Sequence, residues 1–459
     1  MAINLRTQRI QKYSVILGNF RLGLLIFLVT SSNLFIGLGQ TGPLLAQNPF
    51  IPGSDANTTI DPTLRSGEPP ILEKEKPRPP SPPPRLILPP VDSLPELQPK
   101  RAPQVRMMVG TIHVRGSTVF TPEELNKVKA PYENRELSTE DLEELRRALT
   151  LLYINNGYVN SGAIIPDQTV QEGEITFQII EGKLTDINIE GTKNFLPFYF
   201  EQRIALSAWP PLNIRPLKER LQILLQDSRI QRLNSELKPG LKPGEGTLQV
   251  EVEEASPFRA WGEFNNFQAP TIGAERGLGT IAVDNPFGIG DHFVFTYGGS
   301  NGLNPLLDTS YVVPFTPQDT TLGFQYRLND FEVVTSPFDE LDIETQTEIF
   351  TLTLRHPLYR SLTDEVSLSL IGEHLSTKST LGGTGFSFIP GTTNNGKAVV
   401  SALRFAQEWV HREPAQVLSL YSRFSVGLDV LNATNNRVEK DEPDSHFFTW
   451  LGQAQWPVA

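Results

Sequence analysis

The residue types that usually carry catalysis are present in this chain, but their spacing does not favour catalysis. No glycine-rich run is followed by Lys-Ser or Lys-Thr, and no Gly-x-Ser-x-Gly motif occurs. The histidines stand singly, without the short spacings that metal ligands take: His113, His292, His356, His374, His411 and His446. We therefore assign no catalytic, cofactor-binding or metal-binding residue and no cofactor, and we expect that the protein is not an enzyme.

Composition narrows the class of protein further. The 459 residues include no cysteine, which excludes disulfide scaffolds, thiol nucleophiles and cysteine-ligated zinc. The formal net charge is -12, which argues against nucleic acid as a partner. Beyond residue 45, no stretch approaches the roughly 20 apolar residues that a membrane-spanning helix needs.

The N-terminal part has the composition of an export signal followed by a linker. Residues 1–46 read as a secretory signal peptide, with a basic start, the apolar run Leu22–Leu38 and a cleavage site at Ala46. An uncleaved membrane anchor is the alternative, but polar residues interrupt the run. Residues 47–104 are rich in proline, which predicts an extended or disordered spacer and less readily a ligand for an SH3-type domain.

Residues 105–182 have the pattern of a compact α+β domain. Thr121 and Ser138 each begin a predicted helix, with a capping hydroxyl and acids in the first turn. Gly116 follows the first strand, where a turn needs a permissive backbone. The predicted strands are Met107–Arg115, Ala163–Pro166 and Glu174–Ile180. The resulting order is β-α-α-β-β.

Residues 183–257 repeat this order, although the sequence similarity between the two copies is faint. The clearest shared feature is an isoleucine four residues before a glycine, Ile112 and Gly116 in the first copy and Ile187 and Gly191 in the second. The predicted elements are the strand Asp186–Glu190, the helices Leu196–Leu206 and Pro216–Ser228, and the strands Ile230–Leu237 and Thr247–Glu253.

From Phe258 onward, apolar and polar residues alternate with period two. In the stretch Val417–Val430, Leu420, Phe424 and Val426 share one face, while Ser419 and Ser425 share the other. About ten such segments occur: 258–266, 276–283, 291–299, 307–313, 320–328, 347–356, 364–375, 398–410, 416–430 and 446–458.

A soluble β-sandwich also alternates in this way, so two further features decide between the folds. Several segments reach the roughly 9–11 residues that a strand needs to cross a bilayer. Short connections such as 357–363 also alternate with long ones such as 376–397, as periplasmic turns and external loops do. The sequence therefore predicts an antiparallel transmembrane β-barrel for residues 258–459.

A more specific run of residues lies within 105–182. Gly157 can end a helix, and Tyr153 and Tyr158 can pack that helix on the sheet. The full run is Gly116, Tyr153, Gly157, Tyr158, Pro166, Gln168, Gly173, Glu181 and Gly182. It resembles the ShlB-type POTRA domain of two-partner secretion transporters (the TpsB, or ShlB/FhaC/HecB haemolysin secretion/activation, family of the Omp85 superfamily).

The resemblance implies two α+β periplasmic POTRA domains, POTRA 1 over 105–182 and POTRA 2 over 183–257, followed by the barrel. It also implies a location in the bacterial outer membrane, in contact with its lipid. The expected function is recognition and secretion, or activation, of a large β-helical haemolysin- or adhesin-like partner. That partner would be captured unfolded in the periplasm by adding an extended segment to an exposed sheet edge. We expect neither nucleic acid nor a small molecule as substrate.

Two departures from the family pattern stand out. The family's barrel has sixteen strands, with a Val-Arg-Gly-Tyr/Phe motif in a long loop after the eleventh. This chain reaches Ala459 after about its tenth strand and lacks that motif. We therefore expect an incomplete barrel from a C-terminally truncated sequence. The family's N-terminal plug helix is not evident either, and the proline-rich spacer stands in its place.

Candidate residues for binding the exported protein come from the second copy. The residues Ile230, Arg232 and Leu233 lie on the first of its two C-terminal predicted strands, and Leu221 and Leu225 lie on the helix beside it. The competing interpretation, which we favour for the apolar residues, is that they form the domain core.

Two other functions fit parts of the sequence. An Omp85-type assembly factor, which inserts proteins into the outer membrane, also combines POTRA domains with a barrel. A passive porin-like barrel would need no POTRA domains, so the two copies argue against it.

Overall fold

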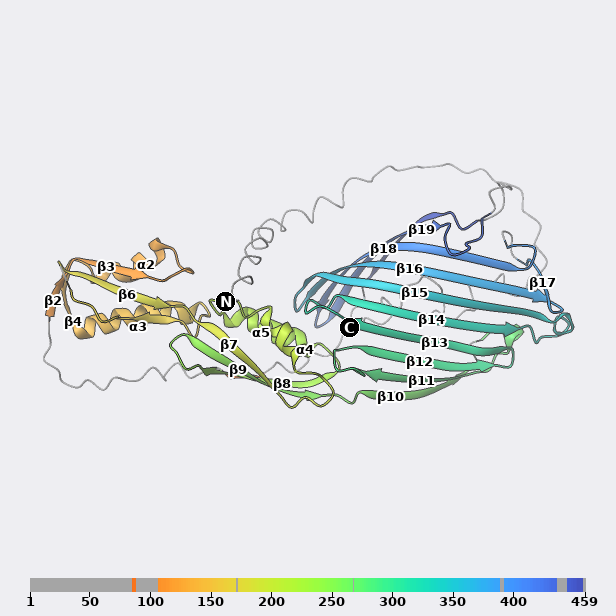
Figure 1. The fold of residues 1–459 in the computed structure, drawn as a ribbon, viewed down its shortest axis with the longest axis horizontal. Coiled ribbons are helices and arrows are strands. Elements are labelled where there is room, and N and C mark those ends of the chain that lie inside the picture. Colours follow the sequence, from red (N-terminus) through yellow and green to blue (C-terminus); the bar gives the residue numbers. More distant parts are fainter. Residues whose placement is uncertain are drawn as a thin grey trace, which may run out of the picture. The chain divides into compact units, whose positions relative to one another are not determined.

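The computed structural model describes residues 85–87, 106–170, 172–266, 268–388, 392–435 and 444–456. The predicted signal peptide, and the predicted linker apart from 85–87, lie outside the described residues. In the described ranges, no helix combines the length and the apolar character needed to span a bilayer. Three groups of elements follow one another (Figure 1): a first repeat (106–182), a second repeat (183–257) and a barrel sheet (258–455).

The first repeat packs two helices on a small sheet. Its elements are β2 Arg106–Val109, β3 Thr111–Arg115, α2 Pro122–Lys129, the short 3-10 helix η3 Ala130–Tyr132, β4 Arg135–Ser138, α3 Thr139–Asn155, β5 Gly162–Ile164 and β6 Glu174–Ile180. Strand β6 lies between β3, to which it is parallel, and β5, to which it is antiparallel.

The helices begin where the sequence predicts them, because both starts carry reciprocal capping boxes. Thr121 accepts the backbone N–H of Glu124, whose carboxylate accepts that of Thr121. Ser138 and Asp141 do the same for α3. Helix α3 buries Leu142, Leu145, Leu149 and Tyr153 against the sheet.

The prediction of one strand over Met107–Arg115 is wrong. The segment forms two strands, with β2 paired to β4 and β3 paired to β6. The break falls at Gly110, whose N–H donates to the Gly173 carbonyl at 2.8 Å. Strand β4 was not predicted. The alternation of residues runs on through the break, so the pattern gives no sign of the change of partner.

The second repeat has the predicted order of elements. It contains β7 Lys183–Glu190, α4 Phe198–Ala205, α5 Ile214–Leu225, β8 Ile230–Pro239 and β9 Glu245–Glu254. Strand β9 lies between β7 and β8, parallel to β7 and antiparallel to β8. Each of its elements overlaps the segment predicted for it, and the differences fall at the ends.

An unpredicted strand covers the free edge of this sheet. Arg85–Ile87, within the predicted spacer, forms β1, which pairs in parallel with β8. The sheet order is therefore β1-β8-β9-β7, and Arg85, Leu86 and Ile87 lie opposite Asn234, Ser235 and Glu236. At these three residues, the predicted extended or disordered spacer takes the form of a paired β-strand.

The barrel sheet consists of long antiparallel strands. They are β10 Phe258–Asn265, β11 Arg276–Asp284, β12 His292–Ser300, β13 Leu303–Pro314, β14 Thr321–Glu332, β15 Ile343–Arg360, β16 Asp364–Leu381, the two-residue β17 Thr384–Gly385, β18 Lys397–Glu413, β19 Gln416–Leu428 and β20 Phe448–Gln455. The 3-10 helices η4 Pro270–Ile272 and η5 Asp339–Leu341 lie in two of its loops.

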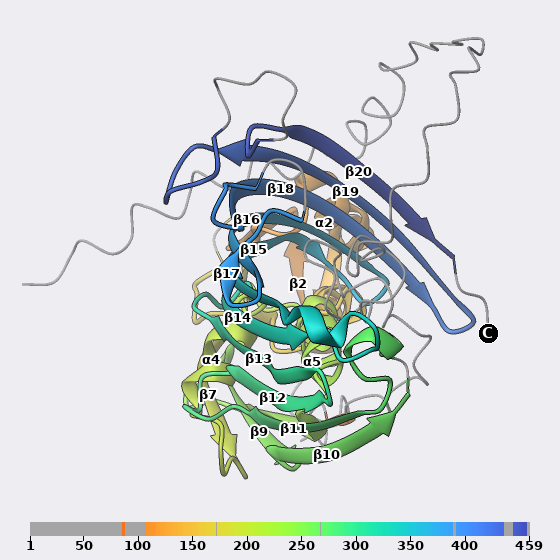
Figure 2. The ribbon, with the colours of Figure 1, turned by 90° about the vertical axis from the view of Figure 1, so that its right-hand side faces the viewer.

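The strands pair in chain order from β10 to β20, with β17 added beside β16. The sheet curves strongly and remains open, with β10 and β20 as its two edges (Figure 2). An incomplete antiparallel barrel of about ten main strands, as predicted from the sequence, is confirmed.

The predicted division between the two faces of the sheet also holds. On β19, Leu420, Phe424 and Val426 are exposed on the outer face, whereas Ser419 and Ser425 are buried on the inner face. The inner face carries ion pairs, including Arg327–Asp308 at 2.9 Å and Arg404–Glu373 at 2.6 Å. An apolar outer face and a polar inner face are typical of outer-membrane barrels.

Candidate functional site

The second repeat holds all five predicted binding residues, and the structure places their side chains in two environments. Ile230, Leu233, Leu221 and Leu225 are buried in the repeat's apolar core. Arg232 is exposed and forms an ion pair with Glu253 on β9, at 2.7 Å. Only Arg232 among the five therefore offers its side chain to a partner.

The edge of β8 is the feature of this repeat that can bind an extended segment. Its middle residues, Asn234, Ser235 and Glu236, lie in register with β1. Backbone hydrogen bonds to an edge strand do not depend on a particular side chain. No residue type in β8 could therefore have identified these three positions, although the strand itself was predicted.

Glu181, part of the predicted motif, caps a turn in the first repeat. Its carboxylate accepts the N–H groups of Thr118 and Val119 at 2.6 and 3.1 Å, and it also bonds the hydroxyl of Thr118. Tyr153 donates its hydroxyl to the same carboxylate at 3.0 Å. Partial burial favours the neutral acid, but these hydrogen bonds outweigh it and lower the pKa of Glu181.

Glu254 plays the same part in the second repeat, and sequence reasoning missed it. It accepts the N–H groups of Lys193, Asn194 and Phe195, at distances from 2.8 to 3.2 Å. As at Glu181, burial opposes the charge, but the hydrogen bonds prevail and lower the pKa. In both repeats, a glutamate at the C-terminal end of the last strand closes the turn between the strand before the first helix, β3 or β7, and that helix.

The other motif residues of the first repeat support its fold. Tyr153 is fully buried, with Phe120 and Tyr158 edge-on against its ring. Gln168 bonds both backbone groups of Thr176 on β6, so that it extends the sheet through its side chain. Pro166, just before it, accepts a long hydrogen bond from the same amide.

The motif glycines lie where a side chain would not fit. Gly157 ends α3 in a left-handed conformation, with φ 95°. Gly173 lies against the backbone of Met108, and Gly116 turns the chain after β3. The Gly182 carbonyl accepts the N–H of Leu212, which links the two repeats.

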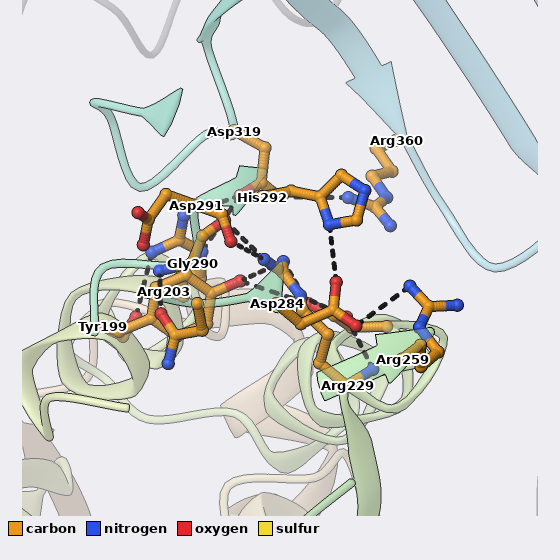
Figure 3. A network of polar contacts seen from close by, with 12 residues as sticks. Tyr199, Arg203, Arg229, Arg259, Asp284, Gly290, Asp291, His292, Asp319 and Arg360 are labelled. Atoms are coloured by element: carbon orange, nitrogen blue, oxygen red, sulfur yellow. Dashed lines mark hydrogen bonds and ion pairs between the residues drawn. The ribbon is translucent and has the colours of Figure 1, made fainter. Parts of the chain in front are cut away.

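The second repeat also contacts the barrel sheet, through residues that were not predicted (Figure 3). Arg203 on α4 donates from Nε and Nη2 to Oδ1 of Asp319, at 3.0 and 2.8 Å. Asp319 lies in the turn between β13 and β14, and its Oδ2 accepts from Arg360 at 3.0 Å. One carboxylate thus joins the repeat to two parts of the sheet. The 116 residues between Arg203 and Asp319 explain why sequence reasoning missed the pair.

A second contact lies beside the first, at the turn between β11 and β12. Arg229 donates to the Gly290 carbonyl and is held by Asp227, with Nη2 and Oδ2 2.6 Å apart. Burial would lower the pKa of Arg229, but the hydrogen bonds and charge of Asp227 raise it. The ring of Tyr199 lies against Gly290, and its burial raises the pKa of its hydroxyl.

Within the described ranges, no group of three or more histidine, aspartate or glutamate side chains could hold a metal ion. The charged groups at the contact are engaged with one another, and the edge of β8 is paired with β1 through main-chain groups.

Two family models match the chain. The POTRA domain, ShlB-type, matches residues 108–182, and the haemolysin secretion/activation protein ShlB/FhaC/HecB matches residues 244–458. Among solved structures, CdiB from Escherichia coli superposes with a TM-score of 0.54 at 19% identity, covering 79% of this chain and 67% of that one. This likeness supports the fold.

Curated relatives agree with the family models. The outer membrane transporter CdiB of Dickeya dadantii (strain 3937) is 26% identical over 197 residues, 41% of this chain and 33% of the relative. The hemolysin transporter protein ShlB of Serratia marcescens is 27% identical over 201 residues, 43% of this chain and 34% of the relative. The matched segments span about a third of the length of these relatives. With one model over the first repeat and the other over the whole barrel sheet, the chain belongs to the ShlB/FhaC/HecB haemolysin secretion/activation family.

Proposed function

We propose that this chain acts as the outer-membrane transporter of a two-partner secretion system. The family places it in the outer membrane, with its POTRA repeats in the periplasm. Its cargo would be one large β-helical haemolysin- or adhesin-like protein, which arrives unfolded. The named relatives are transporters, and the one from Serratia marcescens is a hemolysin transporter.

The observation that carries the proposal is the pairing of β1 with β8. It supports the idea that this sheet edge accepts an extended segment in parallel register. An exported segment would take the same place after displacing β1. Three residue pairs make a short strand, so the displacement costs little and the edge remains available.

Arg232 would contribute to this site as a charged side chain near the end of the edge. The four apolar candidates, Ile230, Leu233, Leu221 and Leu225, would act only by shaping the strand, because they are buried. Outer-membrane lipid would contact the apolar outer face of the barrel sheet.

The first test asks whether export depends on the protein. The gene is deleted in its native host, and the medium is assayed for the large secreted protein encoded beside it. We expect that protein to disappear from the medium while porin levels in the outer membrane stay normal. Undiminished export would refute the proposal, and a fall in porin levels would favour an Omp85-type assembly factor.

The second test asks whether the edge of β8 is used. Ile87 and Glu236 lie opposite each other and are both exposed. The natural chain has no cysteine, so two introduced cysteines can pair only with each other. Oxidation of the Ile87→Cys, Glu236→Cys variant should lock β1 in place and stop export, and reduction should restore it. Ile87→Cys alone is the control. If the locked variant exports normally, the edge is not the capture site.

A further inference from the structure

Within the described residues, one ion pair joins the second repeat to the barrel sheet, that of Arg203 with Asp319. We propose that Asp319 seats the second repeat on the barrel sheet, at the end where the short turns between β11 and β12 and between β13 and β14 lie. Arg203 and Asp319 are then positioning residues. They orient the second repeat so that a segment captured on the edge of β8 passes to the polar inner face of the barrel sheet. The consequence for export rests on the proposed function, whereas the seat itself does not.

Asp319 is built into its turn in a way that fixes its direction. Its backbone lies in the left-handed region, with φ 63°. Its N–H donates to the Thr316 carbonyl at 3.1 Å, and the turn closes through the Phe315 N–H on the Thr320 carbonyl at 3.0 Å. The turn fixes the direction of the Cα–Cβ bond of Asp319, and its carboxylate meets Arg203 on α4 (Figure 3).

Contacts within the second repeat also hold the guanidinium of Arg203. Its guanidinium stacks on the ring of Tyr199, with Cζ 3.6 Å from the ring centroid, and Nη1 donates to the Tyr199 carbonyl. The residue is only 4% exposed. A buried arginine needs a compensating anion, which Asp319 supplies from the sheet.

Within the described residues, the other hydrogen bonds that the second repeat donates across this boundary end on main-chain carbonyls of the sheet. Leu196 donates its N–H to the Gly288 carbonyl at 2.8 Å, and Gln226 donates from its side chain to the Leu362 carbonyl at 3.1 Å. Arg229 donates to the Gly290 carbonyl, and the charge of Asp284 acts on it from farther away. Loss of the Asp319 charge therefore breaks the ion pair with Arg203 while it leaves these hydrogen bonds possible.

The same carboxylate also leads to the inner face of the sheet. Arg360, its second partner, lies 3.8 Å from Glu365, which pairs with Arg355 at 2.6 Å. Arg355 in turn reaches Glu408 at 3.4 Å. The seat is thus one end of a chain of ion pairs that continues along the polar face a transported segment would follow.

The test compares two carboxylates at the same end of the sheet. Asp319→Asn removes the charge and keeps the backbone, because asparagine tolerates a left-handed conformation. Asp364→Asn is the matched control. Its carboxylate bonds Trp409 and His411 within the sheet. Paired spin labels at the exposed Leu241 and Lys397 report the distance between repeat and sheet in the complete, cysteine-free chain.

We expect one narrow distance distribution for the parent chain and for Asp364→Asn. Asp319→Asn should broaden it, with the ratio of seated to unseated molecules falling roughly a hundredfold, as for a broken buried ion pair. An unchanged distribution in Asp319→Asn overturns the proposal, and so does an equal broadening in both variants.

A rescue distinguishes positioning from a folding defect. Gln226→Cys with Leu362→Cys places two cysteines across the contact, and their disulfide should restore the narrow distribution to Asp319→Asn. Export should fall in Asp319→Asn and return on oxidation. Restored distances without restored export refute the positioning role. If the parent chain exports nothing, the proposed function fails, while the distance result still decides the seat.

Discussion

The two repeats share one fold and one device for closing it, but they direct their polar residues differently. In each, a glutamate at the C-terminal end of the last strand binds the N–H groups of the turn that precedes the first helix, Glu181 in one and Glu254 in the other. In the first repeat, the adjoining tyrosine, Tyr153, bonds that glutamate and Ser117 from within the core. In the second, Arg203 and Arg229 reach out to the barrel sheet.

The difference shows how a duplicated domain can acquire a new role at little structural cost. The turn that Glu254 closes also presents Leu196, whose N–H bonds the Gly288 carbonyl of the sheet. Helix α4, which follows, carries Arg203. The second repeat therefore connects the first repeat to the membrane part, whereas in the described residues no hydrogen bond joins the first repeat to the barrel sheet.

The largest expected effect comes from neutralising the capping glutamates. Glu254→Gln turns an acceptor of three N–H groups into a group that carries a donor, so the turn should loosen by about 2–4 kcal/mol. Glu181→Gln should cost less, because two of its four donors are hydroxyls that can reorient. Hydrogen exchange of the amides at 118–119 and 193–195 measures both.

The control is the exposed Glu236→Gln, which should leave exchange at both turns unchanged. Equal and small losses of protection in both glutamate variants would show that packing holds the turns. The two glutamates would then share a position but not a stabilising role.

The same carboxylates should make both turns sensitive to acid. Their folded pKa values are lowered, so their contribution is complete above the unfolded pKa and is lost as the pH falls through the folded pKa. The protection of the amides at 118–119 and 193–195, measured relative to the intrinsic exchange rate at each pH, should therefore fall together below the usual carboxyl pKa. In the glutamine variants this loss of protection should vanish. A loss that persists in them would assign it to other groups.

A third prediction concerns the contact that only the second repeat makes. Gly290 has φ 85°, and an added Cβ would clash with the Tyr199 ring. Gly290→Ala should therefore cost about 1–3 kcal/mol and speed exchange of the Leu196 amide. Gly382→Ala is the matched control, because that glycine also has positive φ but faces open space. Similar effects in both would mean that backbone strain, and not the clash, accounts for the loss.

The sequence predicted the barrel strands well because one face of each strand is mainly apolar and the other mainly polar. It failed at their long-loop ends. Strands β15 and β16 continue into polar stretches such as Glu344–Thr347, where alternation between polar and apolar residues has ended but main-chain pairing has not. Backbone pairing beyond the bilayer needs no pattern in the side chains.

The contact sites were less predictable, for two physical reasons. Strand β1 was missed because parallel addition to an edge uses main-chain groups that every residue has. Arg203 and Asp319 were missed because they meet only after the chain has folded. Glu254, by contrast, left a signal. It follows Gly191 by 63 positions (254 − 191), and Glu181 follows Gly116 by 65 (181 − 116), so alignment of the glycines would have found it.

The smallest effects should come from substitution of the two tyrosines. The difference between these two effects is the finest test of how the two repeats differ. Tyr153 bonds Ser117 and Glu181 at 2.7 and 3.0 Å, whereas Tyr199 reaches Asp227 and Arg229 only at 3.4 Å. Tyr153→Phe should therefore cost about 1 kcal/mol in denaturant unfolding, and Tyr199→Phe less than about 0.5 kcal/mol. Phenylalanine keeps both rings, so apolar packing is unchanged. If Tyr199→Phe costs more, its hydroxyl holds the Asp227–Arg229 pair in place, and the contact with the barrel then depends on the core of the second repeat.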